Sequence, residues 1–512
     1  MSKSKVPIVA IVGRANVGKS SLFNALLGRR EAIVANEPGT TRDSITAKAE
    51  LESGKQFWLV DTAGLKDAAD AFELTIQDQI IEATNAADII LVTVDGTTIL
   101  TDEDRRVAKL AFKSGKKLIL LVNKADKAKK AQIVAFEKLG IKPLIATSAT
   151  QKRGFDELED ALEQALPAAS IVEADDRIHL ALLGRPNVGK SSLYNALAKK
   201  QQAIVADRAG TTRDVNRTLV KYMGREIELF DTAGIRRSGR IEKGVEQFSV
   251  LRSLQAIEQA DVCLLLIDAN ELSVALDQKI AGMIKEAGKG LIIVVSKWDL
   301  LKPAPETSPS DSPSATKNSF SSLNISKDMP RSEKRIFDSL NDELEVPSSG
   351  TSSNKKKKIL DLQSQVARGL QYDFNFVPWA PLVFTSSETG KNVTKIFDLL
   401  TEIMSRRAQT ITTRELNNWL KAVTDRVTPA GLKNRQPKLR YMVQEEGNPI
   451  PAFKIFGSQT KFLHWSYRRH MERKLREKWD YTGTPVQLWF IDRDEQKEKK
   501  FKNNGNRDKY LD

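Results

Sequence analysis

Two short segments of the sequence have the residue types that bind phosphate. The string GRANVGKS begins at Gly13, and the string GRPNVGKS begins at Gly184. Both fit the pattern G-x-x-x-x-G-K-S, in which glycines let the backbone turn its amides toward phosphates and the following helix presents its positive end. The lysine supplies a charge to the β- and γ-phosphates, and the serine supplies a hydroxyl to Mg²⁺. The predicted phosphate-binding residues are Gly13, Arg14, Ala15, Asn16, Val17, Gly18, Lys19 and Ser20 in the first copy, and Gly184, Arg185, Pro186, Asn187, Val188, Gly189, Lys190 and Ser191 in the second.

A DTAG motif follows each of these segments, starting at Asp61 and at Asp231. Its carboxylate comes directly after an apolar run that predicts a strand, where an acid that orients magnesium is expected. The glycine that ends the motif can present its amide to the γ-phosphate. The predicted catalytic residues are Lys19, Asp61, Gly64, Lys190, Asp231 and Gly234, with further nucleotide contacts at Thr62, Ala63, Leu65, Thr232, Ala233 and Ile235.

The string GTTRD lies between these two motifs in each copy. A threonine in this place can close over Mg²⁺ while the γ-phosphate is present and release when it leaves. We favour Thr41 and Thr212 for this role, with the adjacent Thr40 and Thr211 as alternatives. The predicted Mg²⁺ ligands are therefore Ser20, Thr41, Asp61, Ser191, Thr212 and Asp231.

The string NKAD at residues 123–126 predicts which base is bound. Asp126 can accept two hydrogen bonds from the N1 and N2 edge of guanine, and adenine would leave that acid unpaired. Asn123 would contact the other guanine edge, and Lys124 would lie over the ring. The second copy reads SKWD, so Ser296 replaces the asparagine, and we predict guanine preference there with binding weaker by about 1–3 kcal/mol. The remaining predicted contacts are Ala125, Lys297, Trp298 and Asp299, together with Ser148, Ala149, Ser386 and Ser387 from the matching TSA and TSS strings.

The motifs recur at a nearly constant distance along the chain. The pairs of starting positions are 13 and 184, 39 and 210, 61 and 231, and 123 and 296, which are offsets of 171, 171, 170 and 173 residues. Such a repeat indicates domain duplication. Apolar runs such as PIVAIVG, IILVTVDG and LILLVNK predict buried parallel strands, and segments such as SSLFNALLG predict helices between them. Each copy is therefore expected to be an α/β domain, with a mostly parallel sheet and helices on both faces.

The constant offset breaks after the SKWD string. TSA at 147–149 and TSS at 385–387 are 238 residues apart, so the second copy holds about 65 additional residues. They lie mainly between Lys302 and Lys358, in a segment rich in serine and proline that ends in four lysines. This composition cannot bury a core, so we predict a disordered insertion. The lysine run suits a nucleic-acid patch or a solvated linker, and we favour the linker.

Composition and net charge indicate which kinds of partner to expect. The chain has 512 residues and a formal net charge of +14, a surplus typical of proteins with polyanionic partners. Between Ser405 and Trp479 there are 17 Lys and Arg residues against 6 Asp and Glu residues. The sequence contains no apolar run of membrane-spanning length and no signal-peptide pattern, so we expect no membrane partner. The single cysteine, Cys263, indicates a reducing compartment, and we expect a cytoplasmic protein.

The set of motifs is that of the translation-factor-related P-loop GTPases. From about Val6 to Ile491 the chain resembles the EngA (Der) GTPases, in which two GTPase domains precede a KH-like domain. The resemblance implies a GTP-hydrolysing switch that uses GTP, GDP and Mg²⁺, binds ribosomal RNA and assists assembly of the large ribosomal subunit. It implies no obligate oligomer. This chain departs from the family pattern at Ser296 and in the insertion.

The predicted domains follow from these limits. We expect a first GTPase domain at 5–165, an acidic linker at 166–176, and a second GTPase domain at 177–405 with the insertion at about 302–358. A KH-like α+β domain at 411–492 and a basic disordered tail at 493–512 complete the chain.

The C-terminal region predicts helix, strand, strand, helix and strand in that order. The GXXG loop that clamps nucleotides in KH domains is not visible there. The last helix is basic, and we expect its cations to meet RNA phosphates. The alternative is a solvated helix face whose aromatic residues pack inward. The residues concerned are Arg468, Arg469, Arg473, Lys474 and Arg476, with Trp465 and Tyr467 nearby.

The group that drives hydrolysis is less defined by the motifs. Ras-like GTPases have a glutamine after the glycine of DxxG that orients water. Leu65 and Ile235 occupy that position here and cannot polarise water. Related GTPases with this substitution hold K⁺ beside the phosphates through an asparagine of the phosphate loop, which Asn16 and Asn187 match. These asparagines either bind K⁺ or only shape the loop.

Two other functions compete with the ribosomal one. A tRNA-modification GTPase of the TrmE type shares the GTTRD and asparagine features, but it has one GTPase domain and a C-terminal cysteine that this chain lacks. A scaffold that binds nucleotide without useful turnover is the second alternative, and steady phosphate release would separate it from an enzyme.

Overall fold

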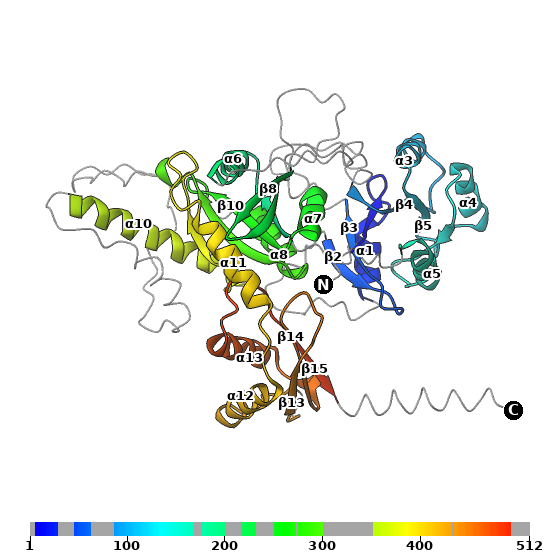
Figure 1. The fold of residues 1–512 in the computed structure, drawn as a ribbon. Coiled ribbons are helices and arrows are strands. Elements are labelled where there is room, and N and C mark those ends of the chain that lie inside the picture. Colours follow the sequence, from blue (N-terminus) through cyan, green and yellow to red (C-terminus); the bar gives the residue numbers. More distant parts are fainter. Residues whose placement is uncertain are drawn as a thin grey trace, which may run out of the picture.

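The computed structural model describes residues 6–28, 46–62, 86–167, 177–200, 217–231, 250–272, 275–300, 352–432 and 435–492. These residues form two similar α/β domains and a smaller α+β domain (Figure 1). The predicted fold class is confirmed. Within the described part of the chain, no helix is both long enough and apolar enough to cross a membrane.

The first domain is built on a six-stranded sheet in the order β2-β3-β1-β4-β5-β6. All neighbouring strands are parallel except the antiparallel pair β2 and β3. The strands are almost continuously apolar because helices cover both faces of the sheet. The strands are β1 (Ile8–Val12), β2 (Thr46–Glu50), β3 (Gln56–Asp61), β4 (Ile89–Asp95), β5 (Lys117–Asn123) and β6 (Leu144–Ala146), and the helices are α1 (Lys19–Gly28), α3 (Asp102–Lys113), α4 (Lys130–Ala135) and α5 (Phe155–Ala165), with the 3₁₀ turn η1 (Phe136–Leu139).

The second domain repeats this sheet in the order β8-β9-β7-β10-β11-β12. Again only the first pair, β8 and β9, is antiparallel. Its strands are β7 (Ile178–Leu183), β8 (Arg217–Tyr222), β9 (Arg225–Asp231), β10 (Val262–Asp268), β11 (Gly290–Ser296) and β12 (Leu382–Phe384), and its helices are α6 (Lys190–Lys200), α7 (Val250–Gln259), α8 (Ala275–Glu286), α10 (Ser352–Asp373) and α11 (Lys395–Arg407), with the 3₁₀ turn η3 (Trp298–Leu300).

Helix α10 corrects one sequence prediction. We predicted disorder for 302–358, but the helix begins at Ser352, so the prediction is wrong for residues 352–358. Lysine is a good helix former, and the lysine run continues directly into a helix whose later residues Val366, Ala367 and Leu370 are buried in the core. A lysine-rich composition also suits a solvated linker, which is why the sequence did not reveal this continuity. The remainder of the predicted insertion, residues 302–351, lies outside the described residues.

The third domain packs two helices on one face of a three-stranded sheet (Figure 1). Strands β13 and β14 are antiparallel, and β14 and β15 are parallel. Met442, Phe453 and Ile455 point toward the helices and are fully buried against Leu416 and Met471. The elements are α12 (Thr413–Arg426), β13 (Lys438–Gln444), β14 (Ala452–Ser458), η4 (Thr460–Phe462), α13 (Trp465–Lys478) and β15 (Gln487–Asp492), in the predicted order.

The second and third domains share a polar junction at the end of α11. The guanidinium of Arg407 donates to the carbonyl oxygens of Asp261 (2.9 Å) and Gly288 (3.2 Å) in the second domain. It also donates to the carbonyl of Pro449 (2.8 Å) in the third. Gly483 adds a second link, since its carbonyl accepts from the amide of Leu291 on β11 (3.0 Å). Carbonyls that are shielded from water need such partners, so the Arg407 side chain holds the two domains in one orientation.

The first and second domains meet between β3 and α7. The indole Nε1 of Trp58 donates to the Glu258 carboxylate at 2.5 Å, and both residues are buried. The amide nitrogen of Gln255 donates to the carbonyl of Ala86 at 2.8 Å. Lys48 lies beside Trp58 in the neighbouring strand; burial lowers its pKa, and the charge of Glu258 opposes that shift. A buried contact of this kind requires all its polar groups to be paired.

The Arg407 junction predicts a stability difference between two adjacent residues. Arg407→Met keeps the volume but removes the charged donor that three carbonyls share, so we expect a loss of about 3 kcal/mol in the free energy of unfolding. Arg406→Met is the matched control, because Arg406 pairs with the more exposed Glu402 and Asp480 and should cost about 1 kcal/mol or less. Thermal unfolding of the full chain measures both. Equal losses in the two variants would contradict this description of the junction.

Candidate nucleotide-binding sites

The two phosphate loops have nearly the same backbone conformation. Asn16 and Gly18 have φ values of 62° and 92°, and Asn187 and Gly189 have 63° and 95°. Left-handed residues at alternate positions turn successive amides toward one side, which makes a concavity for anions. Gly13 is required for a different reason: a Cβ there would lie 2.4 Å from the carbonyl oxygen of Thr93. Each loop leads into a helix, α1 or α6, whose N-terminus adds to the attraction for phosphate.

The phosphate-loop lysines are held by their own loops. The ammonium of Lys19 donates to the carbonyls of Gly13 (2.9 Å) and Arg14 (2.8 Å). Lys190 donates to Gly184 (3.0 Å) and Arg185 (2.6 Å) in the same way. The two lysines are buried, at 6% and 8% exposure. Both charges are therefore fixed beside the amides that would bind phosphate.

The arginine that follows the first glycine ties each loop to the domain. Arg14 lies 3.3 Å from the carboxylate of Asp104 and donates to the hydroxyl of Thr98. Arg185 forms an ion pair with Asp277 at 3.1 Å and also contacts Glu271. Asp104 and Asp277 are buried, which makes these ion pairs structural anchors. We predicted both arginines as nucleotide contacts, and the sequence motifs did not reveal their partners Asp104 and Asp277.

Two of the predicted Mg²⁺ ligands of the first site, Ser20 and Asp61, lie side by side. The hydroxyl of Ser20 donates to Oδ2 of Asp61 at 2.5 Å, across the space between α1 and the end of β3. A hydroxyl and a carboxylate at this separation supply oxygen donors that suit Mg²⁺, which prefers few protein ligands and keeps several waters. Thr62 is held by its hydroxyl to the carbonyl of Ile11 at 2.7 Å. In the second site, Ser191 is the second residue of α6 and Asp231 ends β9, in the equivalent places.

A polar side chain at the end of β5 or β11 joins the phosphate loop to the base-binding loop. In the first site the amide nitrogen of Asn123 donates to the carbonyl of Val17 at 2.9 Å, and its oxygen accepts from the amide of Ala149 at 3.4 Å. In the second site the hydroxyl of Ser296 lies 2.5 Å from the carbonyl of Val188. Serine therefore keeps the link to the phosphate loop.

Serine does not reproduce everything that asparagine does. The Ser296 hydroxyl also lies 3.1 Å from the carbonyl of Ile267. A hydroxyl has one hydrogen to donate, and both acceptors within its reach here are backbone carbonyls of the protein. The site is also roomier: a Cβ on Gly18 would lie 2.4 Å from the Asn123 amide, whereas one on Gly189 would lie 3.9 Å from Ser296. The second base site has one polar group fewer to offer a nucleotide.

An acid that the motifs did not reveal holds each base-binding lysine. Lys124 donates to Asp95 at 2.6 Å and to the carbonyl of Asn16 at 2.9 Å. Lys297 donates to Asp268 at 2.7 Å. Burial alone would raise the pKa of Asp95, but the hydrogen bonds from Lys124 and Thr97 outweigh it and lower the pKa. Asp95 and Asp268 are themselves 173 residues apart, so comparison of the two copies could have found them.

Asp126, the predicted guanine-selecting acid, keeps one carboxylate oxygen without a protein partner. Its Oδ1 atom is buried and has no hydrogen-bond partner among the described residues. An unpaired buried carboxylate oxygen is costly unless a ligand supplies a donor, and the N1 and N2 edge of guanine would do so. Asp299, its counterpart, is exposed. This difference adds to the asymmetry introduced by Ser296.

The remaining predicted base contacts lie beside these residues. The amide of Ala125 donates to the carbonyl of Thr147, and that of Trp298 donates to Thr385, so each TSA or TSS segment packs on the base-binding loop. Ser148 and Ser386 are buried there, next to Ala149 and Ser387. Ala15 and Pro186 lie in the phosphate loops.

Nine predicted residues fall outside the described residues: Thr41, Ala63, Gly64, Leu65, Thr212, Thr232, Ala233, Gly234 and Ile235.

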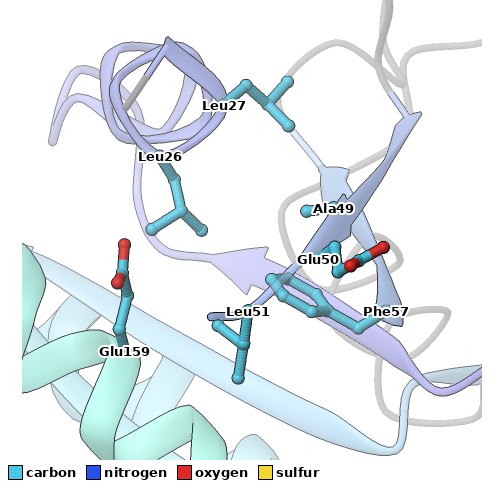
Figure 2. Close-up of a pocket in the computed structure, with 7 residues that line it drawn as sticks. All are labelled: Leu26, Leu27, Ala49, Glu50, Leu51, Phe57 and Glu159. Atoms are coloured by element: carbon cyan, nitrogen blue, oxygen red, sulfur yellow. The ribbon is translucent and has the colours of Figure 1, made fainter. Parts of the chain in front are cut away.

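A small apolar hollow elsewhere in the first domain is not a nucleotide site. Figure 2 shows it between α1, the β2–β3 hairpin and α5, lined by Leu26, Leu51 and Phe57. Its volume of about 10 Å³ is at the lower limit for one water molecule.

The basic helix α13 divides into structural and exposed cations. Arg476 donates to the carbonyls of Tyr481 and Thr484 and pairs with Glu472, so it supports the domain, contrary to the expected RNA contact. Lys474 pairs with Glu477. The other three cations of the predicted set are exposed on α13: Arg468, Arg469 and Arg473.

The two aromatic residues near the start of α13 also separate. Tyr467 packs inward at 3% exposure and donates to the carbonyl of Val427. Trp465, by contrast, is 41% exposed. Sequence spacing alone could not divide the helix in this way, because partners such as Val427, which accepts from Tyr467, come from other elements.

Family models and full-length relatives match most of this chain. Residues 8–124 and 179–297 each match the family described as 50S ribosome-binding GTPase. Residues 410–490 match the KH-domain-like family of the C-terminal part of EngA bacterial GTPase enzymes.

The GTPase Der of Chloroflexus aggregans is 38% identical over 504 residues, which cover 96% of this chain and 99% of that protein. The GTPase Der of Herpetosiphon aurantiacus is 38% identical over 500 residues, covering 96% and 97%. Among solved structures, the FeoB G domain of Methanococcus jannaschii is 29% identical with a TM-score of 0.24, over 31% of this chain and 98% of that one.

Two phosphate loops, each with a buried lysine and a base-binding loop, define a P-loop GTPase that is duplicated within one chain and followed by a KH-like domain. The similarity to the full-length relatives is more specific than this class. The chain belongs to the GTPase Der (EngA) family.

The Ser296 substitution predicts unequal nucleotide binding. We expect Ser296→Asn to tighten GDP binding at the second site by about 1–3 kcal/mol, or roughly 5- to 150-fold, because the longer amide restores a polar contact. The measurement is a GDP titration in a Lys19→Ala background, which isolates the second site. The control is Asn123→Ser in a Lys190→Ala background, which should weaken the first site by a similar factor. An unchanged affinity in both variants would contradict the prediction.

Proposed function

We propose that this chain is a GTP-hydrolysing switch that associates with the large ribosomal subunit and its RNA in the cytoplasm and assists assembly of that subunit. The observation that carries the proposal is the attachment of a basic KH-like domain to a GTPase domain by the Arg407 junction. A nucleotide-dependent change in the second domain would be passed to that domain as a movement of one body. The family's description as ribosome-binding supports the same partner.

The residues of the first site would divide the work among binding, orientation and charge. The amides of the phosphate loop and Lys19 would hold the β- and γ-phosphates. Ser20 and Asp61 would hold Mg²⁺, which neutralises phosphate charge when bound. Asp126 would select guanine. Thr41 would close over the metal in the GTP state and Gly64 would offer its amide to the γ-phosphate, as Thr212 and Gly234 would in the second site.

The second site would use Lys190, Ser191, Asp231 and Asp299 in the same roles. Its guanine recognition would rest mainly on Asp299, because Ser296 is engaged with backbone carbonyls. We therefore infer that the two sites respond to different concentrations of GTP.

The alternative functions are not favoured. A TrmE-type enzyme needs a C-terminal cysteine for its chemistry, whereas the sole cysteine here, Cys263, is buried in β10. Burial raises the pKa of its thiol to about 12, so it would not form a nucleophilic thiolate at neutral pH. A scaffold without turnover is at odds with membership of a GTPase family.

We also propose that K⁺ takes part in hydrolysis, held near the phosphates by Asn16 and Asn187. Both asparagines are exposed at the turn of the phosphate loop, in left-handed conformations. The same conformation suits an asparagine that only shapes the loop.

The K⁺ proposal predicts an ion-dependent rate. Turnover of GTP in KCl should exceed that in NaCl at equal ionic strength by at least about tenfold, because a fixed charge would stabilise the transition state. Asn16→Ala combined with Asn187→Ala should remove the difference while GDP affinity changes little. Equal turnover in the two salts would mean that the asparagines only shape the loop.

Ribosome association predicts nucleotide-dependent co-sedimentation. The purified chain should pellet with large ribosomal subunits in GTP or a non-hydrolysable analogue, less in GDP, and less at higher salt because phosphate contacts release counterions. Lys190→Ala should lose the nucleotide dependence. Small subunits serve as the control, and the absence of binding in every nucleotide state would contradict the proposed function.

A further inference from the structure

One surface of the third domain has no part in the nucleotide sites. It lies where η4 leads into α13, and we call it the α13 corner. It consists of Arg435, Lys461, Phe462, His464, Trp465, Arg468, Arg469 and Arg473. The corner combines one exposed aromatic ring, that of Trp465, with a high density of positive charge.

Trp465 is the central feature of the corner. It is 41% exposed, although an indole normally gains free energy by burial and the domain's own core takes in Tyr467 two residues later. The guanidinium of Arg469 lies 5.0 Å from the centre of its ring, and the ring of His464 lies 5.3 Å away. Arg469 covers part of one face of the indole and His464 lies tilted beside it, so these neighbours restrict its motion while part of its surface stays open to solvent.

Further cations lie on the elements next to Trp465, two of them over the neighbouring Phe462 ring. Arg435 and Lys461 lie 5.7 Å and 5.6 Å from the centre of the Phe462 ring. Arg468 and Arg473 are exposed on α13. The pKa of His470 is lowered mainly by burial, and the nearby charges of Arg473 and Lys474 lower it further. The two acids of α13 are already engaged within the helix, Glu472 with Arg476 and Glu477 with Lys474.

We propose that the α13 corner binds single-stranded RNA, with one unpaired base stacked on Trp465 and the adjoining phosphates on Arg468, Arg469 and Arg473. The proposal rests on the proposed function, which supplies an RNA partner, and it names the form of RNA that the domain recognises. Stacking on an aromatic side chain needs a base free of its helix, whereas a duplex would offer the corner only its phosphates. The charge of the corner matches the RNA backbone, and the exposed indole matches a base.

The test compares a short labelled single-stranded RNA with a duplex of the same length by fluorescence anisotropy, using the full-length chain. Trp465→Ala should weaken binding of the single strand by about tenfold and leave the duplex unchanged, while Trp465→Phe should retain most of the affinity. Tyr441→Ala is the matched control, because Tyr441 is an aromatic residue of similar exposure, 40%, on the sheet. It should change neither affinity.

The salt dependence separates stacking from charge. Arg468→Gln combined with Arg473→Gln should lower the slope of log affinity against log salt by about 0.7 for each arginine that no longer meets a phosphate, whereas Trp465→Ala should leave the slope unchanged. Thermal unfolding of each variant would show that the domain remains folded. A wild-type affinity in Trp465→Ala, or an equal loss for single strand and duplex, would overturn the proposal.

The same variants distinguish this inference from the proposed function. If the chain co-sediments with large subunits in GTP but Trp465→Ala binds single-stranded RNA as tightly as wild type, only the α13 corner is wrong. If the chain binds single-stranded RNA through Trp465 but binds no ribosomal particle in any nucleotide state, the RNA site at the α13 corner is supported and the proposed ribosomal function is contradicted.

Discussion

Each nucleotide site depends on one hydrogen bond between a strand end and the phosphate loop. The donor is Asn123 in the first domain and Ser296 in the second, and the acceptor is the carbonyl of Val17 or Val188. This bond fixes the distance between the loop that binds phosphates and the loop that reads the base, which lie about a hundred residues apart in each domain. A nucleotide must span that distance, so the bond sets the geometry that the remaining contacts use. The two copies differ in the donor and share the acceptor.

The contacts between domains give the duplicated sites a route to one another. Trp58 belongs to β3, three residues before Asp61, and its indole is bonded to Glu258 of the second domain. Glu258 lies near the end of α7, and its carbonyl accepts from Lys289, which precedes β11. A displacement of β3 in the first domain would therefore be transmitted to α7 and β11 of the second domain, because packed interiors deform little. From there the Arg407 junction leads to the KH-like domain.

Much of this arrangement could be predicted from residue types and spacing, for a physical reason. Phosphate loops, strands and base-binding loops are each encoded by neighbouring residues. Gly18, Lys19 and Ser20 act within one turn, and the strands can be recognised as apolar runs. What could not be predicted depends on partners distant in the sequence. Asp95 meets Lys124 only across the sheet edge, and Tyr467 turns inward to donate to the carbonyl of Val427, forty residues before it. The helix over residues 352–358 was missed because its composition also suits a linker. The mostly parallel sheet followed from the duplicated pattern and is present in both domains.

The duplication places two GTPase domains with the same scaffold in one chain, and we predict that their base recognition is unequal. Calorimetric titration of the wild-type chain with GDP in the presence of Mg²⁺ addresses both properties at once. We expect two GDP bound per chain in two distinguishable phases, with the weaker phase absent after Lys190→Ala. A single phase with two equal sites would contradict the inequality, and binding of only one GDP would contradict the duplication of function itself.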